Sequence, residues 1–345
     1  MRGERVTDLG KRILAATLAL TMVLSTMLLA LPVSGTKAAY EYYVTGDQND
    51  VEKHTSPGLL LVGGGTDIEA AMKWMIDKSG GGDFVVIRCA GTDAYDPWIY
   101  TDLGGVNSCE TIIILSAAAC NDPFVIEKIR SAEALFIAGG DQWNYVRLWK
   151  GTPVEDAIQE VATRAPVGGT SAGLAILGEF AFSAENGTIY SKKALDNPFD
   201  RHLTLVNDFL SLPNMAGKIT DSHFVARDRM GRLVAFMARI IQDGWATEAK
   251  GIGIDQETAM GVEPNGDVTL FGLSSASAAY FLVSTGPPKV CHSKTPLTFL
   301  DISVYRISGT ATFNLATWQG NGGTAYTLSA VAGTLTSTQP DGGIY

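Results

Sequence analysis

The residues best suited to chemistry lie in a glycine-rich stretch at positions 169–173, whose sequence GTSAG has the pattern G-x-S-x-G. A short apolar approach at 165–167 precedes it, and a helix-like run at 174–179 follows. A serine on such a strand-to-helix turn exposes its hydroxyl, and flanking glycines allow a turn that larger side chains would block. The N–H groups of the following helix start would face a developing oxyanion. This context favours a nucleophilic Ser171 over a purely structural turn.

A serine hydroxyl needs a base to react at neutral pH, and the chain offers four histidines. His223 alone lies between an apolar approach and a predicted helix start, with Asp221 two residues earlier. The other three, His54, His202 and His292, lie in polar or loop-like stretches. A lone histidine is often structural, but the serine turn favours His223 as the general base.

Three arginines, Arg227, Arg229 and Arg232, follow His223 closely. On a helix predicted over 227–242, Arg229 and Arg232 would share a face. They could form an ordinary solvated helix face. Beside a candidate base in an acidic protein, they favour a site for substrate carboxylates, which arginine binds in bidentate fashion.

The elements that must position these residues alternate between apolar strands and helices. Such strands are typical of a parallel sheet covered by helices on both faces, so we expect a doubly wound α/β fold with C-terminal β-hairpins. Strands are predicted at 58–62, 84–89, 111–115 and 134–138, and helices at 68–78, 123–131, 154–164 and 227–242.

Glycine turns at the ends of two strands, 63–65 and 139–140, place a site along the carboxyl edge of the sheet. The turn at 63–65 lacks both the G-x-G-x-x-G spacing and a P-loop lysine. We therefore interpret it as a tight turn beside the serine site, in preference to a nucleotide-binding loop.

The chain divides into three predicted parts. Residues 1–38 read as a signal peptide, with a basic start, an apolar run and small residues before a cleavage site after Ala38. The alternative is an uncleaved membrane anchor, because the apolar run is long enough to span a bilayer. Residues 39–310 form the predicted catalytic domain. Residues 311–345, rich in Gly and Thr, form a β extension or a tail.

Composition limits the partners. The 345 residues carry a net charge of −10, and removal of 1–38 would leave 21 basic against 34 acidic residues. An acidic, secreted or extracytoplasmic domain argues against nucleic acid and anionic membrane as partners. The four cysteines make no dense disulfide framework, and we expect Cys89 and Cys120 to be buried thiols. No C-x-x-C or H-E-x-x-H motif is present, so no metal or other cofactor is expected.

In their order along the chain, several motifs together resemble peptidase family S51. The similarity is to the cyanophycinase branch of these serine exopeptidases, which is related to the aspartyl dipeptidases and has a fold like class I glutamine amidotransferases. The resemblance covers roughly residues 58–306. It rests on Gly139-Gly140-Asp141-Gln142, on residues 168–173, on Asn197-Pro198, on Asp221, His223, Phe224 and the three arginines, and on Gly253-Ile254-Asp255.

The resemblance implies Ser171 as nucleophile, His223 as base and a downstream acid as the third member of a triad. It also implies that Gln142, Asp221 and the three arginines line the substrate cleft. Two positions depart from the family pattern: Ser222 replaces a glutamine, and Gln256 stands where the acid is expected. The residue that orients His223 could then be Glu257, after a small shift in the alignment, or Asp255, or Gln256 itself through its amide.

The expected function is exported, serine-type hydrolysis of cyanophycin, a polymer of aspartate whose side chains carry arginine, to β-Asp-Arg dipeptides. The amides of Ala172 and Gly140 would hold the oxyanion. Rival functions are an aspartyl dipeptidase, an esterase, and a non-catalytic binding protein on the same fold. The expected partner is a peptide, and the sequence leaves the oligomeric state open, a homodimer included.

Overall fold

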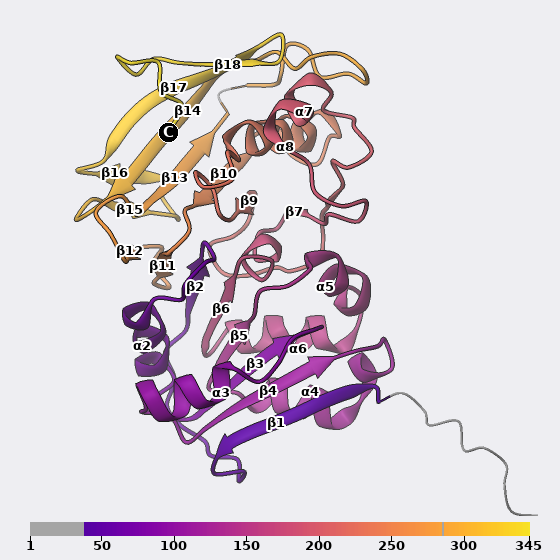
Figure 1. Ribbon diagram of the computed structural model, residues 1–345, viewed down its shortest axis with the longest axis vertical. Coiled ribbons are helices and arrows are strands. Elements are labelled where there is room, and N and C mark those ends of the chain that lie inside the picture. The colour runs from indigo at the N-terminus through magenta and orange to yellow at the C-terminus, as the bar shows by residue number, and fades with distance from the viewer. Residues whose placement is uncertain (1–37, 285) are drawn as a thin grey trace, which may run out of the picture. The chain divides into compact units, whose positions relative to one another are not determined.

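The computed structural model describes residues 38–284 and 286–345 (Figure 1). The predicted signal peptide lies outside these residues except for Ala38, so its cleavage and its alternative as an anchor stay predictions. None of the described helices is long and apolar enough to cross a membrane. Residues Ala39–Tyr345 group into one unit by their contacts.

Eight strands form the first sheet, in the order β1-β4-β3-β5-β6-β2-β11-β12. The neighbours from β4 to β2 pair in parallel, whereas β1, β11 and β12 pair antiparallel. The predicted mostly parallel α/β sheet is confirmed. Its strands are β1 (Tyr40–Gly46), β2 (Gly58–Val62), β3 (Asp83–Arg88), β4 (Ser108–Ile114), β5 (Ala134–Ile137), β6 (Pro166–Thr170), β11 (Thr258–Val262) and β12 (Val268–Gly272).

Helices cover both faces of this sheet, because alternate apolar residues of each strand point to opposite sides. Leu59 and Leu61 of β2 pack in one cluster with α4, α5 and α6. Leu60 and Val62 belong to a second cluster with residues of α2. The helices are α2 (Glu69–Lys78), α3 (Tyr95–Pro97), α4 (Pro123–Ser131), α5 (Gln142–Trp149) and α6 (Pro153–Ala162), with a π-helical turn at Trp98–Leu103 and a 3₁₀ turn at Ala119–Asn121.

A second sheet follows in the chain, in the order β18-β17-β14-β13-β10-β9. Only β9 and β10 pair in parallel, and the strands after them form the predicted antiparallel C-terminal structure. Leu233 and Phe236 of α8 pack in one cluster with Leu282 of β13. These elements are β9 (Lys218–Asp221), β10 (Lys250–Ile254), β13 (Ala278–Val283), β14 (Phe299–Ser308), β17 (Thr324–Val331), β18 (Thr334–Ser337), α7 (Ser191–Asp196) and α8 (Met230–Gln242).

Two short two-stranded sheets complete the described strands. One pairs β7 (Ala181–Phe182) with β8 (Leu205–Val206) across the segment that contains α7, and the other is a hairpin of β15 (Thr312–Asn314) and β16 (Gln319–Asn321). Phe313 of β15 stacks on Phe281 of β13 with 3.7 Å between ring centroids, so this hairpin packs against the second sheet.

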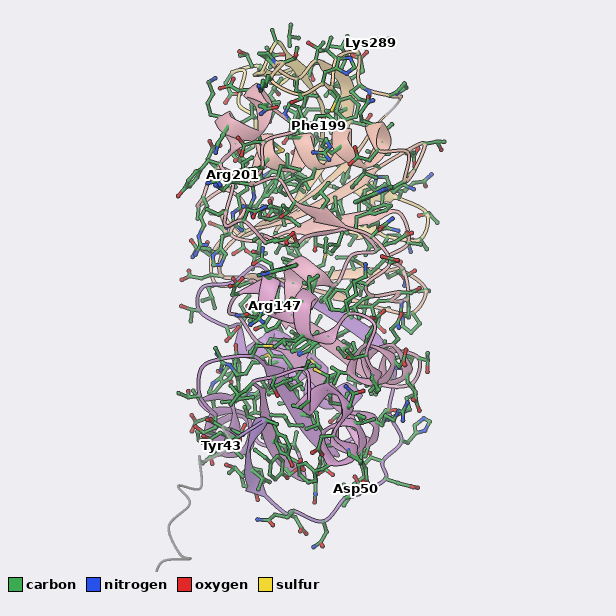
Figure 2. The ribbon with its side chains drawn as sticks, turned by 90° about the vertical axis from the view of Figure 1, so that its right-hand side faces the viewer. Tyr43, Asp50, Arg147, Phe199, Arg201 and Lys289 are labelled. Carbon is green, nitrogen blue, oxygen red and sulfur yellow. The ribbon has the colours of Figure 1, made fainter. Side chains whose placement is uncertain are left out.

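The Asn197-Pro198 motif has a structural position in the second half of the chain. The Asn197 side chain accepts hydrogen bonds from the Phe199 and Lys294 amides, at 3.2 and 2.8 Å. The Arg239 guanidinium donates to the Pro198 carbonyl at 2.8 Å and lies 3.9 Å from the centroid of the Phe199 ring (labelled in Figure 2). The motif therefore ties α7 to α8 and to a distant loop, away from the serine.

All four cysteines are free and buried. This agrees with the prediction of buried thiols for Cys89 and Cys120 and adds Cys109 and Cys291. Burial raises the pKa of the Cys291 thiol to about 12, so this side chain behaves as a small apolar group.

Candidate active site

Ser171 lies on a strained turn directly after β6. Its φ of 53° is in the left-handed region, and its amide donates to the Val62 carbonyl of β2 at 3.1 Å. A Cβ at Gly169 would lie 2.7 Å from the Gly173 backbone, and one at Gly173 would lie 2.1 Å from the Ile137 carbonyl oxygen. Both glycines are therefore required by the close turn that the G-x-S-x-G pattern predicts.

The prediction of a helix over residues 174–179 is wrong. Only a 3₁₀ turn, Leu174–Ile176, follows the serine. The chain leaves the helical path at Gly178, where a Cβ would come within 2.6 Å of the Lys218 carbonyl oxygen. So short a turn contributes little helix dipole to an oxyanion site.

His223 lies on the turn after β9, with its Nε2 atom 2.8 Å from the Ser171 Oγ. The side chain is 5% exposed and its φ is 46°. Its amide donates to the Gly63 carbonyl at 2.7 Å. A Cβ at Gly64 would lie 2.5 Å from the imidazole ring. The turn at 63–65 is thus the surface against which the candidate base packs.

The other ring nitrogen of His223, Nδ1, is buried and has no hydrogen-bond partner within the described part of the chain. Glu257 flanks the same turn, since its amide donates to the Gly64 carbonyl at 2.8 Å, but its carboxylate accepts from the Thr66 hydroxyl at 3.3 Å. Asp255 accepts from the Val225 amide at 2.8 Å. Among the described residues, none of the three candidates, Asp255, Gln256 and Glu257, is hydrogen-bonded to His223. The third member of the triad therefore stays a prediction.

We expect Glu257→Gln to lower kcat about tenfold or more beyond the effect of Gln256→Ala. The reason is that only an ionised side chain stabilises the imidazolium that forms during attack. Steady-state kinetics of both variants measure the difference. Glu248→Gln, which removes a half-exposed carboxylate paired with Lys250, controls for the loss of one charge. Equal or reversed effects would assign the role to Gln256 or Asp255.

The surroundings of His223 favour its neutral form. Burial, followed by the charges of Arg227 and Arg229, lowers the pKa of His223 from its ordinary value of 6.5 to about 4, while Asp221 opposes the shift. A neutral imidazole is the form that accepts a proton from serine. His223 is therefore ready to act as a base throughout the neutral and mildly acidic range.

We expect kcat/KM to stay nearly constant as the pH falls from about 7 to about 5 and to decline only as it falls through about 4, because the base must be neutral. Arg227→Gln removes one of the causes and should move this acid limb toward higher pH. A pH profile on fully folded enzyme measures both. An acid limb near 6.5 in the wild type, unmoved in Arg227→Gln, would contradict this account.

Asp221 holds two of the three arginines from behind the site. It is 2% exposed, and its Oδ2 accepts from the Arg232 Nε at 2.7 Å. Its Oδ1 accepts from Arg229 at 3.2 Å, and Arg229 also donates to the Ser222 carbonyl at 2.8 Å. The expectation that Asp221 lines the cleft is corrected, because two guanidinium groups occupy its carboxylate.

The arginines also differ from the predicted common helix face. Asp228 has a φ of 47°, which an α-helix excludes, so α8 begins only at Met230. Arg227 and Arg229 therefore lie on the preceding loop. The Arg227 side chain is exposed and has no hydrogen-bonded partner among the described residues, which leaves its guanidinium free for a ligand.

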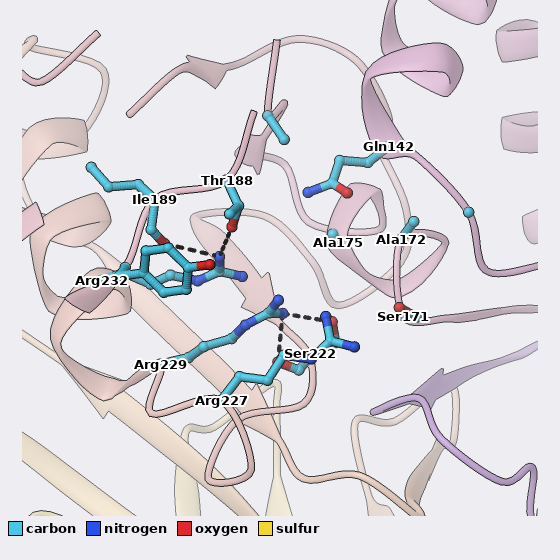
Figure 3. Close-up of a pocket in the computed structure, with 13 residues that line it drawn as sticks. Gln142, Ser171, Ala172, Ala175, Thr188, Ile189, Ser222, Arg227, Arg229 and Arg232 are labelled. Carbon is cyan, nitrogen blue, oxygen red and sulfur yellow. Dashed lines mark hydrogen bonds between the residues drawn. The ribbon is translucent and has the colours of Figure 1, made fainter. Parts of the chain in front are cut away.

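A cavity of about 520 Å³ opens beside Ser171, in the size range of small-ligand sites. The three arginines lie on one side of it, and Ser171, Ala172, Ala175 and Gln142 lie on the other (Figure 3). No carboxylate is among its lining residues, so among the residues described the cavity is cationic. The lining comprises Gly140, Gln142, Ser171, Ala172, Ala175, Ala184, Thr188, Ile189, Tyr190, Ser222, Arg227, Arg229 and Arg232.

The predicted oxyanion residues, Gly140 and Ala172, both line this cavity. Neither amide has a hydrogen-bonded partner in the described parts of the chain. The Tyr145 hydroxyl bonds the Ala138 and Gly139 carbonyls at 2.9 and 3.2 Å. In a trans peptide the N–H opposes the C=O, so this bond turns the Gly140 N–H away from Tyr145.

Sequence reasoning missed one wall of the cavity, formed by Thr188, Ile189 and Tyr190. Arg232 donates to the Thr188 hydroxyl at 3.2 Å and to the Ile189 carbonyl at 3.3 Å, and Tyr190 is 70% exposed. In the sequence these residues form an ordinary polar loop. No motif in this stretch indicates a role in the site, because that role depends on the position of Arg232 in the folded chain.

Residues 102–263 match the model of peptidase family S51. The matched residues are just under half of the chain, and they include the serine turn and His223, whose side chains lie 2.8 Å apart. This part of the chain is similar to the peptidases of family S51. The match includes Ser171, His223, Glu257 and all three arginines.

Curated proteins similar to this chain are cyanophycinases. That of Trichormus variabilis is 26% identical over 215 residues, which are 61% of this chain and 66% of that protein. That of Synechococcus elongatus is 23% identical over 230 residues, 64% of each chain. The matched stretch thus spans about two thirds of the length of these relatives.

A solved structure of a peptidase from an acI-B1 actinobacterium is similar in fold. It has a TM-score of 0.50 and 16% sequence identity, and the alignment covers 76% of this chain and 98% of that one. This likeness supports the α/β fold alone.

Proposed function

We propose that this protein is an exported serine-type exopeptidase of family S51 that hydrolyses cyanophycin, or a related aspartyl peptide, to dipeptides. The observation that carries the proposal is the 2.8 Å contact between the Ser171 Oγ and the His223 Nε2 at the edge of a cationic cavity. Export is supported only by the sequence of residues 1–38.

In the proposed reaction, the Ser171 Oγ attacks the scissile carbonyl carbon while His223 Nε2 takes the hydroxyl proton. The carbonyl oxygen becomes an oxyanion, held by the amides of Gly140 and Ala172. The C–N bond then breaks, and His223 gives its proton to the departing amine. Water, activated by His223, hydrolyses the acyl-enzyme and restores Ser171.

The charges of the cavity support aspartyl peptides as the substrate class. Arg227 has a free guanidinium, and Arg229 and Arg232 add positive charge that the single carboxylate of Asp221 offsets only in part. A substrate with aspartyl or terminal carboxylates would neutralise the remaining positive charge. A neutral ester gains nothing from such a site.

We expect Arg227→Gln to raise KM for the aspartyl peptide that the enzyme cleaves by about ten- to thirtyfold, since a charge-assisted hydrogen bond contributes about 1.5–2 kcal/mol. KM for a neutral ester such as p-nitrophenyl acetate should not change. Arg147→Gln is the control for the lost charge, because the Arg147 guanidinium donates to the Asn144 side chain on α5. Equal KM changes for both substrates would contradict a carboxylate-binding role for Arg227.

A second candidate, an aspartyl dipeptidase for short peptides, is favoured by one observation. The carboxylates that lie near the site in sequence are not among the residues that line the cavity: Asp141 caps α5 through the Trp143 amide at 3.0 Å, and Asp221 is buried. The cavity therefore offers arginines that can bind substrate carboxylates, but its lining residues include no carboxylate that could bind the arginine side chains of cyanophycin.

The experiment that separates these functions compares cyanophycin granules, β-Asp-Arg and β-Asp-Leu dipeptides, casein and p-nitrophenyl acetate, with mass analysis of the products. Release of β-Asp-Arg from granules, in preference to casein and ester cleavage, supports the polymer hydrolase. Intact granules with cleaved dipeptides would establish the dipeptidase instead. No turnover of any of these would favour a binding protein.

A further inference from the structure

One loop carries both the candidate base and the free arginine. This loop, residues 223–229, has two residues with positive φ, His223 at 46° and Asp228 at 47°. Such a backbone is retained only where surrounding contacts determine it. The contacts that hold this loop therefore decide where the base lies.

One edge of the 223–229 loop rests on the second sheet. The Phe224 amide donates to the Ile254 carbonyl at 3.2 Å, and the Val225 amide donates to the Asp255 carboxylate at 2.8 Å. The Phe224 ring is fully buried over Gly253, where a Cβ would come within 2.6 Å of the ring. These bonds fix the start of the loop and leave its end to other contacts.

Tyr345 holds both ends of the loop with a single side chain. Its hydroxyl donates to the Asp228 carboxylate at 2.9 Å and accepts from the Met230 amide at 3.1 Å, so it bonds the residues on either side of Arg229. Its ring meets the Phe224 ring edge-on, with 5.8 Å between centroids. Phe224 is the residue next to His223.

Tyr345 is itself anchored by the C-terminal strands. Its ring also meets the Tyr280 ring edge-on at 5.9 Å. The Gln339 side chain donates to the Tyr345 backbone oxygen at 3.1 Å, and the Tyr326 hydroxyl donates to the Ile344 carbonyl at 3.0 Å. Tyr345 lies outside residues 102–263, so the family match does not explain this arrangement.

We propose that Tyr345 is a positioning residue for the 223–229 loop: it keeps His223 against Ser171 and keeps Arg227 and Arg229 at the cavity. The C-terminal segment would thereby set the activity of a site formed by distant residues. The consequence for activity rests on the proposed function, whereas the position of the loop can be measured without turnover.

The test compares Tyr345→Phe, which loses both hydroxyl bonds, with Tyr345→Ala, which also loses the ring contacts. We expect kcat/KM for the aspartyl peptide that the wild type cleaves to fall about fivefold in the first and about a hundredfold in the second, since a misplacement of about 1 Å can cost that much. Tyr305→Phe is the matched control, because the Tyr305 hydroxyl accepts from the Gly323 amide at 2.9 Å, away from the loop.

A second readout, independent of turnover, is NMR titration of the four histidines in the full chain. Burial, followed by the charges of Arg227 and Arg229, lowers the pKa of His223, and its titration midpoint should be near pH 4 in the wild type. The midpoint should rise toward 6.5 in Tyr345→Ala, because a displaced loop would expose the imidazole to solvent and move its arginines away. This readout decides the proposal even if the wild type cleaves no peptide.

An unchanged His223 titration and unchanged kcat/KM in both Tyr345 variants, with only a lower melting temperature, would overturn the proposal. If Tyr345→Ala fails to fold, the same two measurements on Tyr345→Phe decide it. An equal loss of kcat/KM in Tyr305→Phe would also contradict it, because general destabilisation would then explain the effect.

Discussion

Replacing Ser171 with alanine is expected to lower kcat for aspartyl peptides by roughly 10⁴- to 10⁶-fold, because no other group would attack the carbonyl carbon. The fold should remain, since alanine keeps the same Cβ at a φ of 53° and loses only the bond to His223. Circular dichroism and a thermal melt check the fold, and single-turnover kinetics measure the loss.

The pair Ser171 and His223 also gives a sharper test. If the two side chains act as one unit, His223→Ala should cost about as much as Ser171→Ala, and the double variant should be no worse than either single one. Losses that multiply in the double variant would mean that the residues act independently. A folded Ser171→Ala variant that keeps more than a small fraction of activity would exclude the serine as nucleophile.

Replacing Asp221 with asparagine is expected to cost about 3–5 kcal/mol of unfolding free energy, because it leaves Arg229 and Arg232 without their buried counter-charge. Asparagine has nearly the same shape, so the loss would come from charge and not from packing. Displacement of these arginines should also raise KM for the aspartyl peptide substrate. Urea denaturation measures the first effect and steady-state kinetics the second.

Asp243→Asn is the matched control for Asp221→Asn. Asp243 pairs with Arg239 one helical turn away on α8, at 2.8 Å and closer to solvent. Such a pair contributes about 1 kcal/mol or less. If Asp221→Asn costs no more than Asp243→Asn, the Asp221 cluster does not hold the arginines in the way that the distances indicate.

The α/β fold could be predicted from sequence because its determinants are local. The strands β2 and β5 are runs of apolar residues that end in glycine turns, and β2 and α4 have the bounds that the patterns predict. The serine turn could be predicted for the same reason, since Gly169 and Gly173 are required where two backbone segments lie close together. The strand β1 escaped prediction because its pairing partner β4 is more than sixty residues away.

The charges of the site were harder to predict, because their roles depend on residues far apart in sequence. Three arginines near a histidine indicate a cationic site, but not that Asp221 holds two of them while Arg227 stays free. Nothing in the sequence around Tyr345 connects it to Met230, which lies 115 residues earlier. Contacts of this kind become visible only in the folded chain.

Reaction of the wild-type protein with a serine-directed phosphonate, followed by peptide mapping by mass spectrometry, tests the central claim most directly. We predict one label per chain, on Ser171, and no label in His223→Ala at the same pH. The label should also be suppressed by an aspartyl dipeptide that occupies the cavity. An unmodified Ser171, or a label on another residue, would contradict the account.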